Sequence, residues 1–305
     1  MRWFSLGRVS FASFMLMILS FVVSASLVGW SRYPAEVLRI YDEAVFPRTS
    51  IREKGAVPFA RHTEIVVKTD DADVAIVVSA KEDLDSTLEG DMVALPEGQH
   101  LSVSVDEVAV TIRTRERPAS AWLHEFVSRT TPAPKLTIGL PKDFSGVVRV
   151  ETGSGRVSLR NASLSEFAVK SKSGDVLVTG SDVHIVTIET RSGGIGLDAK
   201  AQKVTVETLS GDIEAKLRDA AEALHPSLSF WSKTGAIRVG VHAGASLAVL
   251  LETTSGTLES KIPLSGRVES NDRRLAGDVG TGRGTLFART WSGPLTLEQL
   301  PSIER

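Results

Sequence analysis

Two glutamates, Glu189 and Glu207, occupy the same slot in successive copies of a repeated phrase, where a pair of carboxylates could do acid–base chemistry. A retaining glycosidase needs carboxyl groups about 5 Å apart, and stacked strands lie about 4.8 Å apart. Lys170, Lys172 and Arg191 fall on the same face, as charged residues do in β-helical polysaccharide lyases and hydrolases. Stacking pairs like residues in any such repeat, however. We therefore predict that the protein is not an enzyme, with a carbohydrate-active β-helix enzyme as the minor alternative.

The other reactive residue types show no pattern that would bind a cofactor, a metal ion or a nucleic acid. Six histidines are scattered without metal-ligand spacing, and the absence of cysteine excludes a disulfide scaffold and a lipoprotein anchor. Asp175 and Asp212 follow Ser-Gly pairs, but the GGxGxD period of a calcium β-roll is absent. The net charge of −2 lacks the excess of positive charge that is typical of nucleic-acid-binding proteins. We expect no cofactor, no metal ion and no nucleic-acid partner.

Two tryptophans break an otherwise polar pattern of outward slots. Trp231 takes a slot that is glutamate or lysine in most other copies, and Trp291 takes the slot of Lys172 and Arg191. Exposed aromatic rings on a solenoid face can stack on sugar rings or contact a protein partner. Trp231 and Trp291 are therefore the candidate ligand-binding residues. The alternative is that insertion loops cover them.

The elements that would position these residues are the short strands of a repeat. From Val148 onward, alternating apolar residues lead to a Ser/Thr-Gly pair and a second alternating run. The pivotal glycines recur at intervals of 19, 19, 18, 24 and 21 residues, at Gly155, Gly174, Gly193, Gly211, Gly235 and Gly256. Alternation is the strand period, and the spacing is too short for a crossover helix. The pattern predicts an all-β fold, a parallel β-solenoid with coils of about 18–21 residues.

Stacking in sequence order predicts which residues lie above one another. The internal apolar ladder would be Val150, Val169, Ile188, Val206, Phe230 and Leu251. A hydroxyl ladder at the corner would be Thr152, Ser171, Thr190, Thr208, Ser232 and Thr253, able to bond within the ladder or to corner backbone groups. Two insertions break the period: the helically spaced segment Lys216–His225 and a polar segment, Lys261–Asp278, expected to be a loop.

The N-terminal segment indicates where the protein works. Arg2 and Arg8 precede a charge-free run, from Val9 to Ser31, that is long enough to span a bilayer. The expected location is the cell membrane, single-pass with the N-terminus inside, so that the C-terminal domain is extracytoplasmic. The alternative is secretion after cleavage near Ala25. The assignments are 1–32 as transmembrane anchor or signal segment, 33–60 as juxtamembrane linker, 61–147 as the irregular β N-terminal part of the solenoid and 148–300 as the regular Ser-Gly repeats.

The run KLTIGLPKDFSGVVRVETGSGRVSL and the VETxSGDI-type coils after it resemble the bacterial adhesin-like family DUF4097, as does a membrane segment ahead of degenerate strands. The resemblance covers about residues 60–300, and this chain departs from it in a long loop, 115–134, and in the two insertions. It implies a right-handed β-helix-like fold outside a bacterial membrane, and it supplies no catalytic residues to carry over to this chain. The implied function is a binding module, an adhesin for an envelope polymer or surface ligand. The alternative is an accessory protein of an envelope stress or sensing system, acting through a protein partner.

Overall fold

The computed structural model describes residues 48–58, 63–93, 99–114, 133–218, 225–242 and 244–301. Ser50–Glu116 and Pro132–Arg305 group as one compact unit. Every regular element in the described residues is a β-strand, so the predicted all-β class is confirmed. No helix that could cross a membrane occurs among them. The predicted membrane segment, 1–32, and most of the segment expected to be helical lie outside the described ranges.

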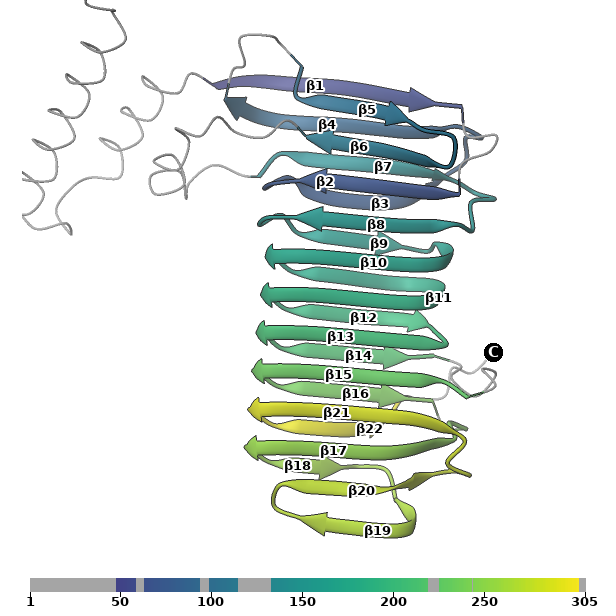
Figure 1. Ribbon diagram of the computed structural model, residues 1–305, viewed down its shortest axis with the longest axis vertical. Coiled ribbons are helices and arrows are strands. Elements are labelled where there is room, and N and C mark those ends of the chain that lie inside the picture. The colour runs from purple at the N-terminus through teal and green to yellow at the C-terminus, as the bar shows by residue number, and fades with distance from the viewer. Residues whose placement is uncertain are drawn as a thin grey trace, which may run out of the picture. The chain divides into compact units, whose positions relative to one another are not determined.

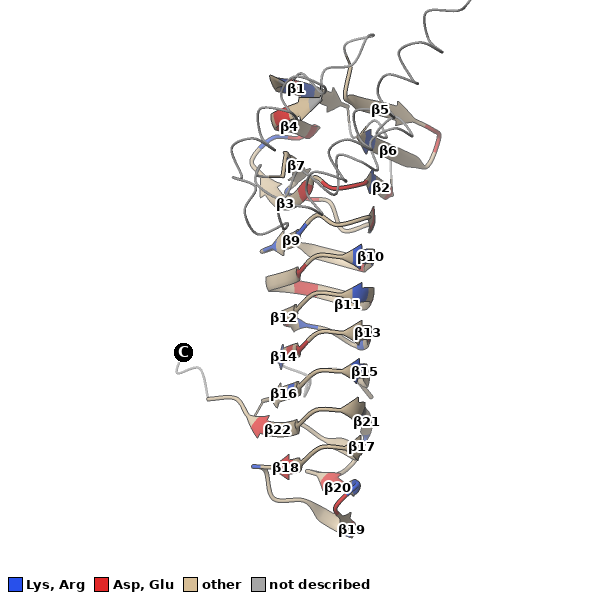
Figure 2. Ribbon diagram, turned by 90° about the vertical axis from the view of Figure 1, so that its left-hand side faces the viewer, with Lys and Arg blue, Asp and Glu red and all other residues tan. Residues whose placement is uncertain are grey.

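The strands stack in two columns that enclose the core, and Figures 1 and 2 show the stack from two directions. Within both columns the repeat strands pair in parallel, which confirms the predicted mode of stacking. The strand β11 (Val176–Ser192) bends from one column into the other. The first column contains β6 (Ala109–Thr114), β2 (Glu64–Thr69), β8 (Val147–Thr152), β10 (Ser163–Ser173), β13 (Lys203–Ser210), β15 (Ser227–Thr234), β21 (Gly284–Ser292) and β17 (Leu247–Ser255). The second contains β7 (Lys135–Pro141), β3 (Asp73–Ser79), β9 (Val157–Arg160), β12 (Ile195–Lys200), β14 (Ile213–Leu217), β16 (Ile237–Val241), β22 (Leu295–Gln299) and β18 (Leu258–Ser260).

Antiparallel strands close both ends of the stack. At one end β4 (Leu84–Val93) pairs with β7 and with β1 (Arg48–Val57), and β5 (Leu101–Val105) pairs with β6. At the other end β20 (Arg274–Val279) pairs with β17, and β19 (Ser265–Asn271) pairs with β20. Every residue of β19 is exposed, and its sequence is mostly polar. A polar edge strand protects the open end of a sheet from further pairing. The segment expected to be a loop, Lys261–Asp278, thus contains this hairpin.

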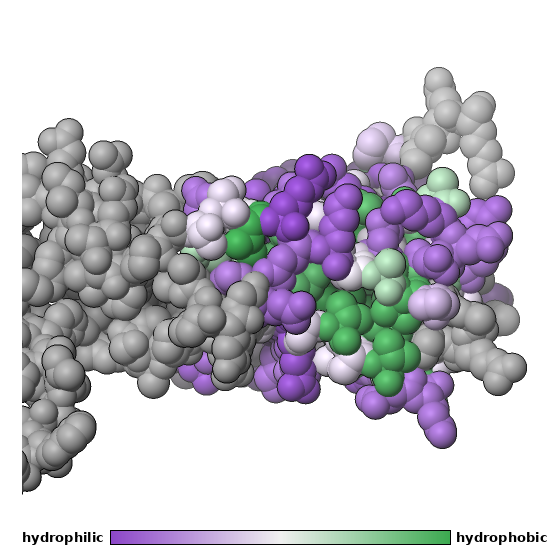
Figure 3. Space-filling model, turned by 90° about the horizontal axis from the view of Figure 1, so that it is seen from above, coloured by the Kyte–Doolittle hydropathy of each residue, from purple (hydrophilic) through white to green (hydrophobic). Residues whose placement is uncertain are grey.

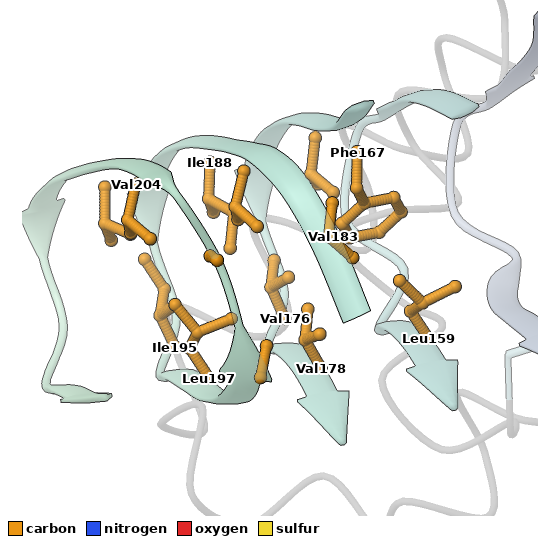
Figure 4. Packing of buried hydrophobic residues seen from close by; sticks show 14 of the residues in the cluster. Leu159, Phe167, Val176, Val178, Val183, Ile188, Ile195, Leu197 and Val204 are labelled. Atoms are coloured by element: carbon orange, nitrogen blue, oxygen red, sulfur yellow. The ribbon is translucent and has the colours of Figure 1, made fainter. Parts of the chain in front are cut away.

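Side chains that alternate inward along each strand form the core (Figure 4). The predicted ladder is confirmed from Val150 to Phe230, since each member is in register with the next. The prediction is wrong at its last step, because Ala288 of β21 lies between Phe230 and Leu251. The last coil of the chain, β21 and β22, is inserted before the coil that precedes it in sequence. The first described coil, β2 and β3, is likewise inserted between β6–β7 and β8–β9.

The inserted order has a physical reason at the C-terminal end. β17 and β21 both bury every second residue from their first to their seventh position, so either could pair with β15. The polar hairpin β19–β20 follows β17 in sequence and cannot be buried inside the stack. β17 therefore pairs with β20 at the end of the column, and the chain returns to fill the slot beside β15.

The Ser-Gly corners stack so closely that no side chain fits between them. A Cβ on Gly193 would lie 2.3 Å from the carbonyl oxygen of Gly174, and a Cβ on Gly293 would lie 2.2 Å from that of Gly235. Both glycines also have φ values, 121° and 147°, that L-residues rarely adopt. The repeated glycine is thus required by the approach of one coil to the next.

The strand β1 lies within the range assigned to a linker, 33–60, and it helps to close the end of the stack seen in Figure 3. Hydrophobic and hydrophilic residues are interspersed there, with Ile51 and Val103 partly buried against the core. Glu53 of β1 accepts hydrogen bonds from the backbone N–H of His100, 3.0 Å, and of Leu101, 2.7 Å. Its Oε1 also lies 3.1 Å from His100 Nδ1. Burial opposes ionisation of this carboxyl, but the hydrogen bonds outweigh it and lower the pKa of Glu53.

Replacing Glu53 with glutamine is expected to lower the free energy of unfolding at neutral pH by about 1–3 kcal/mol, the range for a hydrogen-bonded charge. A lowered carboxyl pKa stabilises the fold above the ordinary glutamate pKa, and this contribution is lost as the pH falls through the folded-state value. The difference between wild type and Glu53→Gln should therefore shrink towards about pH 3. Urea unfolding of the wild type and of Glu53→Gln, at neutral pH and at about pH 3, measures this difference in the free energy of unfolding. Glu82→Gln, at an exposed residue, is the control, and equal midpoints for the two variants at neutral pH would contradict a stabilising role of the Glu53 hydrogen bonds.

Candidate functional site

The outer face of the first column has two rows of side chains that cross the strands. The first, which we call the charge row, is in register from β6 to β20 and consists of Arg113, Lys68, Glu151, Lys170, Glu189, Glu207, Trp231, Arg289, Glu252 and Arg274. The second, the edge row, lies two residues further along each strand, next to the Ser-Gly corners. It consists of Lys172, Arg191, Leu209, Lys233, Trp291 and Thr254.

A groove of about 1090 Å³ follows these rows from β6 to β15. Gln99–Ser102, which include the first two residues of β5, line it at one end, and Trp231 lines it at the other. The five charged residues that the sequence places on one face, Lys170, Lys172, Glu189, Arg191 and Glu207, all line it. From β2 to β15 the groove crosses five strand spacings, or about 24 Å. Its length suits an extended ligand that runs across the strands.

Ion pairs between adjacent strands satisfy much of the charge row. Lys68 Nζ lies 2.8 Å from Glu151 Oε2, and Lys170 Nζ lies 3.6 Å from Glu189 Oε2. Glu207 is directly in register with Glu189, as the sequence predicts, and no described cation lies within ion-pairing distance of it. Both carboxylates are exposed to solvent. Such pairs are weak individually, so the row contributes little to stability and remains available to a ligand.

The inserted coil brings the two tryptophans together on the outer face. Trp231 of β15 is directly in register with Arg289 of β21, and Trp291 lies two residues beyond Arg289 on the same face. Diagonal neighbours of this kind are separated by about 7–8 Å at the backbone. Trp231 is half-buried, whereas Trp291 is 58% exposed. If the coils were stacked in the order of the sequence, β17 would lie between β15 and β21 and would separate the two tryptophans.

Two further residues of this face were not singled out from the sequence. Phe287 lies two residues before Arg289, points outward and is half-buried, so three aromatic side chains surround this arginine. Leu209, 46% exposed, lies diagonal to Trp231 on the other side. The alternation in LFARTW is a strand signal, but only the pairing of β21 with β15 shows that these residues share a surface.

The other candidate residues have structural roles at the corners. The Oδ1 atom of Asp175 accepts a hydrogen bond from the backbone N–H of Gly194, 3.0 Å, and Asp212 does the same for Ala236, 2.7 Å. In the hydroxyl ladder, Thr190 Oγ1 donates to the carbonyl oxygen of Ser192, 2.9 Å. Within the ranges given above, no group of histidine and carboxylate side chains is placed to hold a metal ion.

This arrangement of repeats is one that a known family shares. The Toastrack DUF4097 family model matches residues 62–298. The chain belongs to this family. The predicted resemblance is thereby confirmed, and the tryptophans, the groove and both rows all lie within the Toastrack region. No curated protein matches the chain.

Several solved structures are similar to this chain at low sequence identity. A candidate adhesin from Bacteroides fragilis is 13% identical, with a TM-score of 0.41, over 83% of this chain and 98% of that one. A candidate adhesin from Parabacteroides merdae is 10% identical, with a TM-score of 0.43, over 82% and 96% of the two chains. A candidate lipid-binding protein from Parabacteroides distasonis is 14% identical, with a TM-score of 0.31, over 82% and 97%.

Proposed function

We propose that this Toastrack protein is a non-enzymatic binding module that holds a polymer of the cell envelope. The observation that carries the proposal is the placement of Trp231 and Trp291 on adjacent strands of one face, with Trp231 at the end of a groove that crosses the column. Aromatic side chains offer flat apolar surfaces to sugar rings, and charged neighbours can bond to sugar hydroxyl groups. The groove crosses strands rather than closing into a deep pocket, which suits a polymer better than a small molecule.

The absence of catalysis is part of the proposal. Hydrolysis of a glycosidic bond needs one carboxylic acid that keeps its proton in an apolar or charged surrounding. Glu189 and Glu207 are both exposed, and Lys170 pairs with Glu189. Both carboxylates also face an open groove, where water has free access to a bound sugar.

The proposed location is outside the cytoplasmic membrane. The charge-free run from Val9 to Ser31 would anchor the chain with its N-terminus inside, or would be removed near Ala25 to release a secreted protein. In either case the described strands would meet the envelope polymers directly. Anchoring would keep the binding face within reach of the wall.

The experiment is cosedimentation of the full-length protein, in a non-ionic detergent, with purified bacterial cell wall and with insoluble polysaccharides. The double variant Trp231→Ala/Trp291→Ala is expected to bind about 10- to 100-fold more weakly, because aromatic anchors dominate such interfaces. Leu177→Ala is the matched control, since Leu177 is an exposed apolar residue on the outer face of the second column. Equal binding by the double variant would remove the tryptophans from the site. Failure of the wild type to bind any polymer would overturn polymer binding and favour an envelope protein as the partner.

A further inference from the structure

The cations of the edge row have no acidic partner among the described residues, unlike Lys68, Lys170 and Arg274 of the charge row. Lys172, Arg191 and Lys233 are not within 4 Å of any described carboxylate oxygen, whereas Lys68 and Lys170 are paired. The edge row is also free of acidic residues from β10 to β21, where its other members are Leu209 and Trp291. An unpaired cation beside an exposed apolar side chain is well suited to hold an anionic group of a ligand that stacks on that side chain.

The same stripe of cations continues into a pocket of about 530 Å³ beyond Trp291. Three arginines line it, Arg273, Arg274 and Arg289, against two carboxylates, Glu252 and Asp272. Arg274 Nε lies 3.9 Å from Glu252 Oε1, and neither of the other two guanidinium groups is paired with a described residue. The pocket thus has more positive than negative groups and has polar side chains from Thr253, Thr254 and Asn271 around them.

The turn that presents two of these arginines is held in place. The Oδ1 atom of Asn271 accepts hydrogen bonds from the backbone N–H groups of Arg273, 2.9 Å, and Arg274, 2.8 Å. The backbone N–H of Thr253 in turn donates to the carbonyl oxygen of Arg273, 2.9 Å, which ties the turn to β17. A guanidinium group on a fixed turn loses less conformational entropy when it binds a planar or tetrahedral oxyanion.

Arg289 joins the pocket to the aromatic face, because it lines the pocket and is in register with Trp231. Six cations therefore lie on the two neighbouring rows and the adjoining turn. Lys172, Arg191 and Lys233 come from the edge row, Arg289 and Arg274 come from the charge row, and Arg273 comes from the turn before β20; we call them together the cation stripe. From β10 to β20 the stripe crosses six strand spacings, about 29 Å. Glu189, Glu207 and Glu252 belong to the charge row. Each lies two residues before the edge-row position of its own strand, a backbone separation of about 7 Å.

We propose that the ligand is an anionic glycan, a sugar polymer whose carboxylate or phosphate groups bind the cation stripe while its sugar rings contact Trp231 and Trp291. The inference rests on the proposed function, which leaves the charge of the polymer open. Guanidinium groups bind carboxylate and phosphate oxygens through two parallel hydrogen bonds, and the Arg273–Arg274–Arg289 pocket can receive one such group. A repeating anion along the polymer would meet the lysines and Arg191 in succession.

The test compares polygalacturonate with fully methyl-esterified polygalacturonate, the same backbone without charge. The full-length protein, in non-ionic detergent, is passed over each immobilised polymer. We expect at least about tenfold tighter binding to the acidic polymer and a progressive loss of affinity as NaCl is raised. Arg273→Gln/Arg289→Gln should weaken binding about tenfold. Arg160→Gln, which removes a cation from the outer face of the second column, is the control and should have little effect. Poly(glycerol phosphate) in a second arm shows whether phosphate replaces carboxylate.

The outcomes separate this inference from the proposed function. Tighter binding to either acidic polymer, weakened by the arginine changes, supports the cation stripe. Equal binding to neutral and acidic polymers, weakened by the tryptophan changes but not by the arginine changes, would overturn the anionic ligand and leave polymer binding intact. Equal losses from the arginine variant and from Arg160→Gln would show a general charge effect and would also overturn the stripe. Binding to none of the polymers would overturn both proposals.

Discussion

Gly193→Ala is expected to destabilise the protein by about 3–5 kcal/mol, a large fraction of the stability of a typical domain. The new Cβ would lie 2.3 Å from the carbonyl oxygen of Gly174 and 2.7 Å from its carbonyl carbon. These are backbone atoms, and the N–H of Gly174 is itself bonded to the carbonyl oxygen of Ser192, so they cannot give way as a flexible side chain could. The φ of 121° adds strain for any L-residue. Thermal unfolding followed by circular dichroism measures the loss.

The neighbouring glycine provides a matched control for this prediction. A Cβ on Gly194 would have its nearest contact at 3.6 Å, with Asp175 Oδ1, and its backbone is not in the left-handed region. Gly194→Ala is therefore expected to change the free energy of unfolding by less than about 1 kcal/mol. Similar melting temperatures for the two alanine variants would contradict the close stacking of the corners. A large loss for Gly193→Ala alone would support it.

Ending the chain after Arg283, so that β21 and β22 are missing, is expected to abolish the folded state of the C-terminal half of the stack. The deleted coil contributes four fully buried apolar side chains, Leu286, Ala288, Leu295 and Leu297. It also pairs on both sides, with β15 and β17 in one column and with β16 and β18 in the other. Losing this burial costs more than about 5 kcal/mol, which is comparable with the stability of a whole domain.

Limited proteolysis and hydrogen exchange would locate the damage. We expect β15 to β20 to become protease-sensitive, whereas β8 to β13, which keep their neighbours on both sides, should remain protected longest. A chain that ends at Pro301 keeps all of β22 and is the control. An unchanged melting temperature after the longer deletion would mean that β17 can pair directly with β15, the order that the repeat alone predicts.

Much of the coil architecture was predictable because it depends on local pattern. The period-two alternation around Val150 and Ile188 places these residues inside, and the Ser-Gly pairs mark the corners. Consecutive coils from β8 to β15 then stack in sequence order, so the register of Glu189 with Glu207 follows directly. The caps were not predictable in this way, since their strands pair antiparallel and lack the repeated phrase.

The candidate site was predicted only in part. Trp231 and Trp291 stand out in the sequence because they replace charged residues in outward slots. Their proximity does not follow from the repeat, because β17 lies between β15 and β21 in the order of the chain. Arg289 gains importance only when it is found between the two aromatic positions, and the pocket of arginines depends on the turn that leads into β20.

The sequence by itself determined the kind of coil, its corners and which face of each strand is buried, because each of these depends on residues a few positions apart. Only the tertiary structure decided which coils are neighbours at the two ends. β17 and β21 present the same alternating pattern to β15, so local interactions do not distinguish them. The choice depends on the polar hairpin β19–β20, which must stay at the surface and so keeps β17 at the end of the column. That choice brings Trp231 and Trp291 to adjacent strands and thereby creates the proposed binding face.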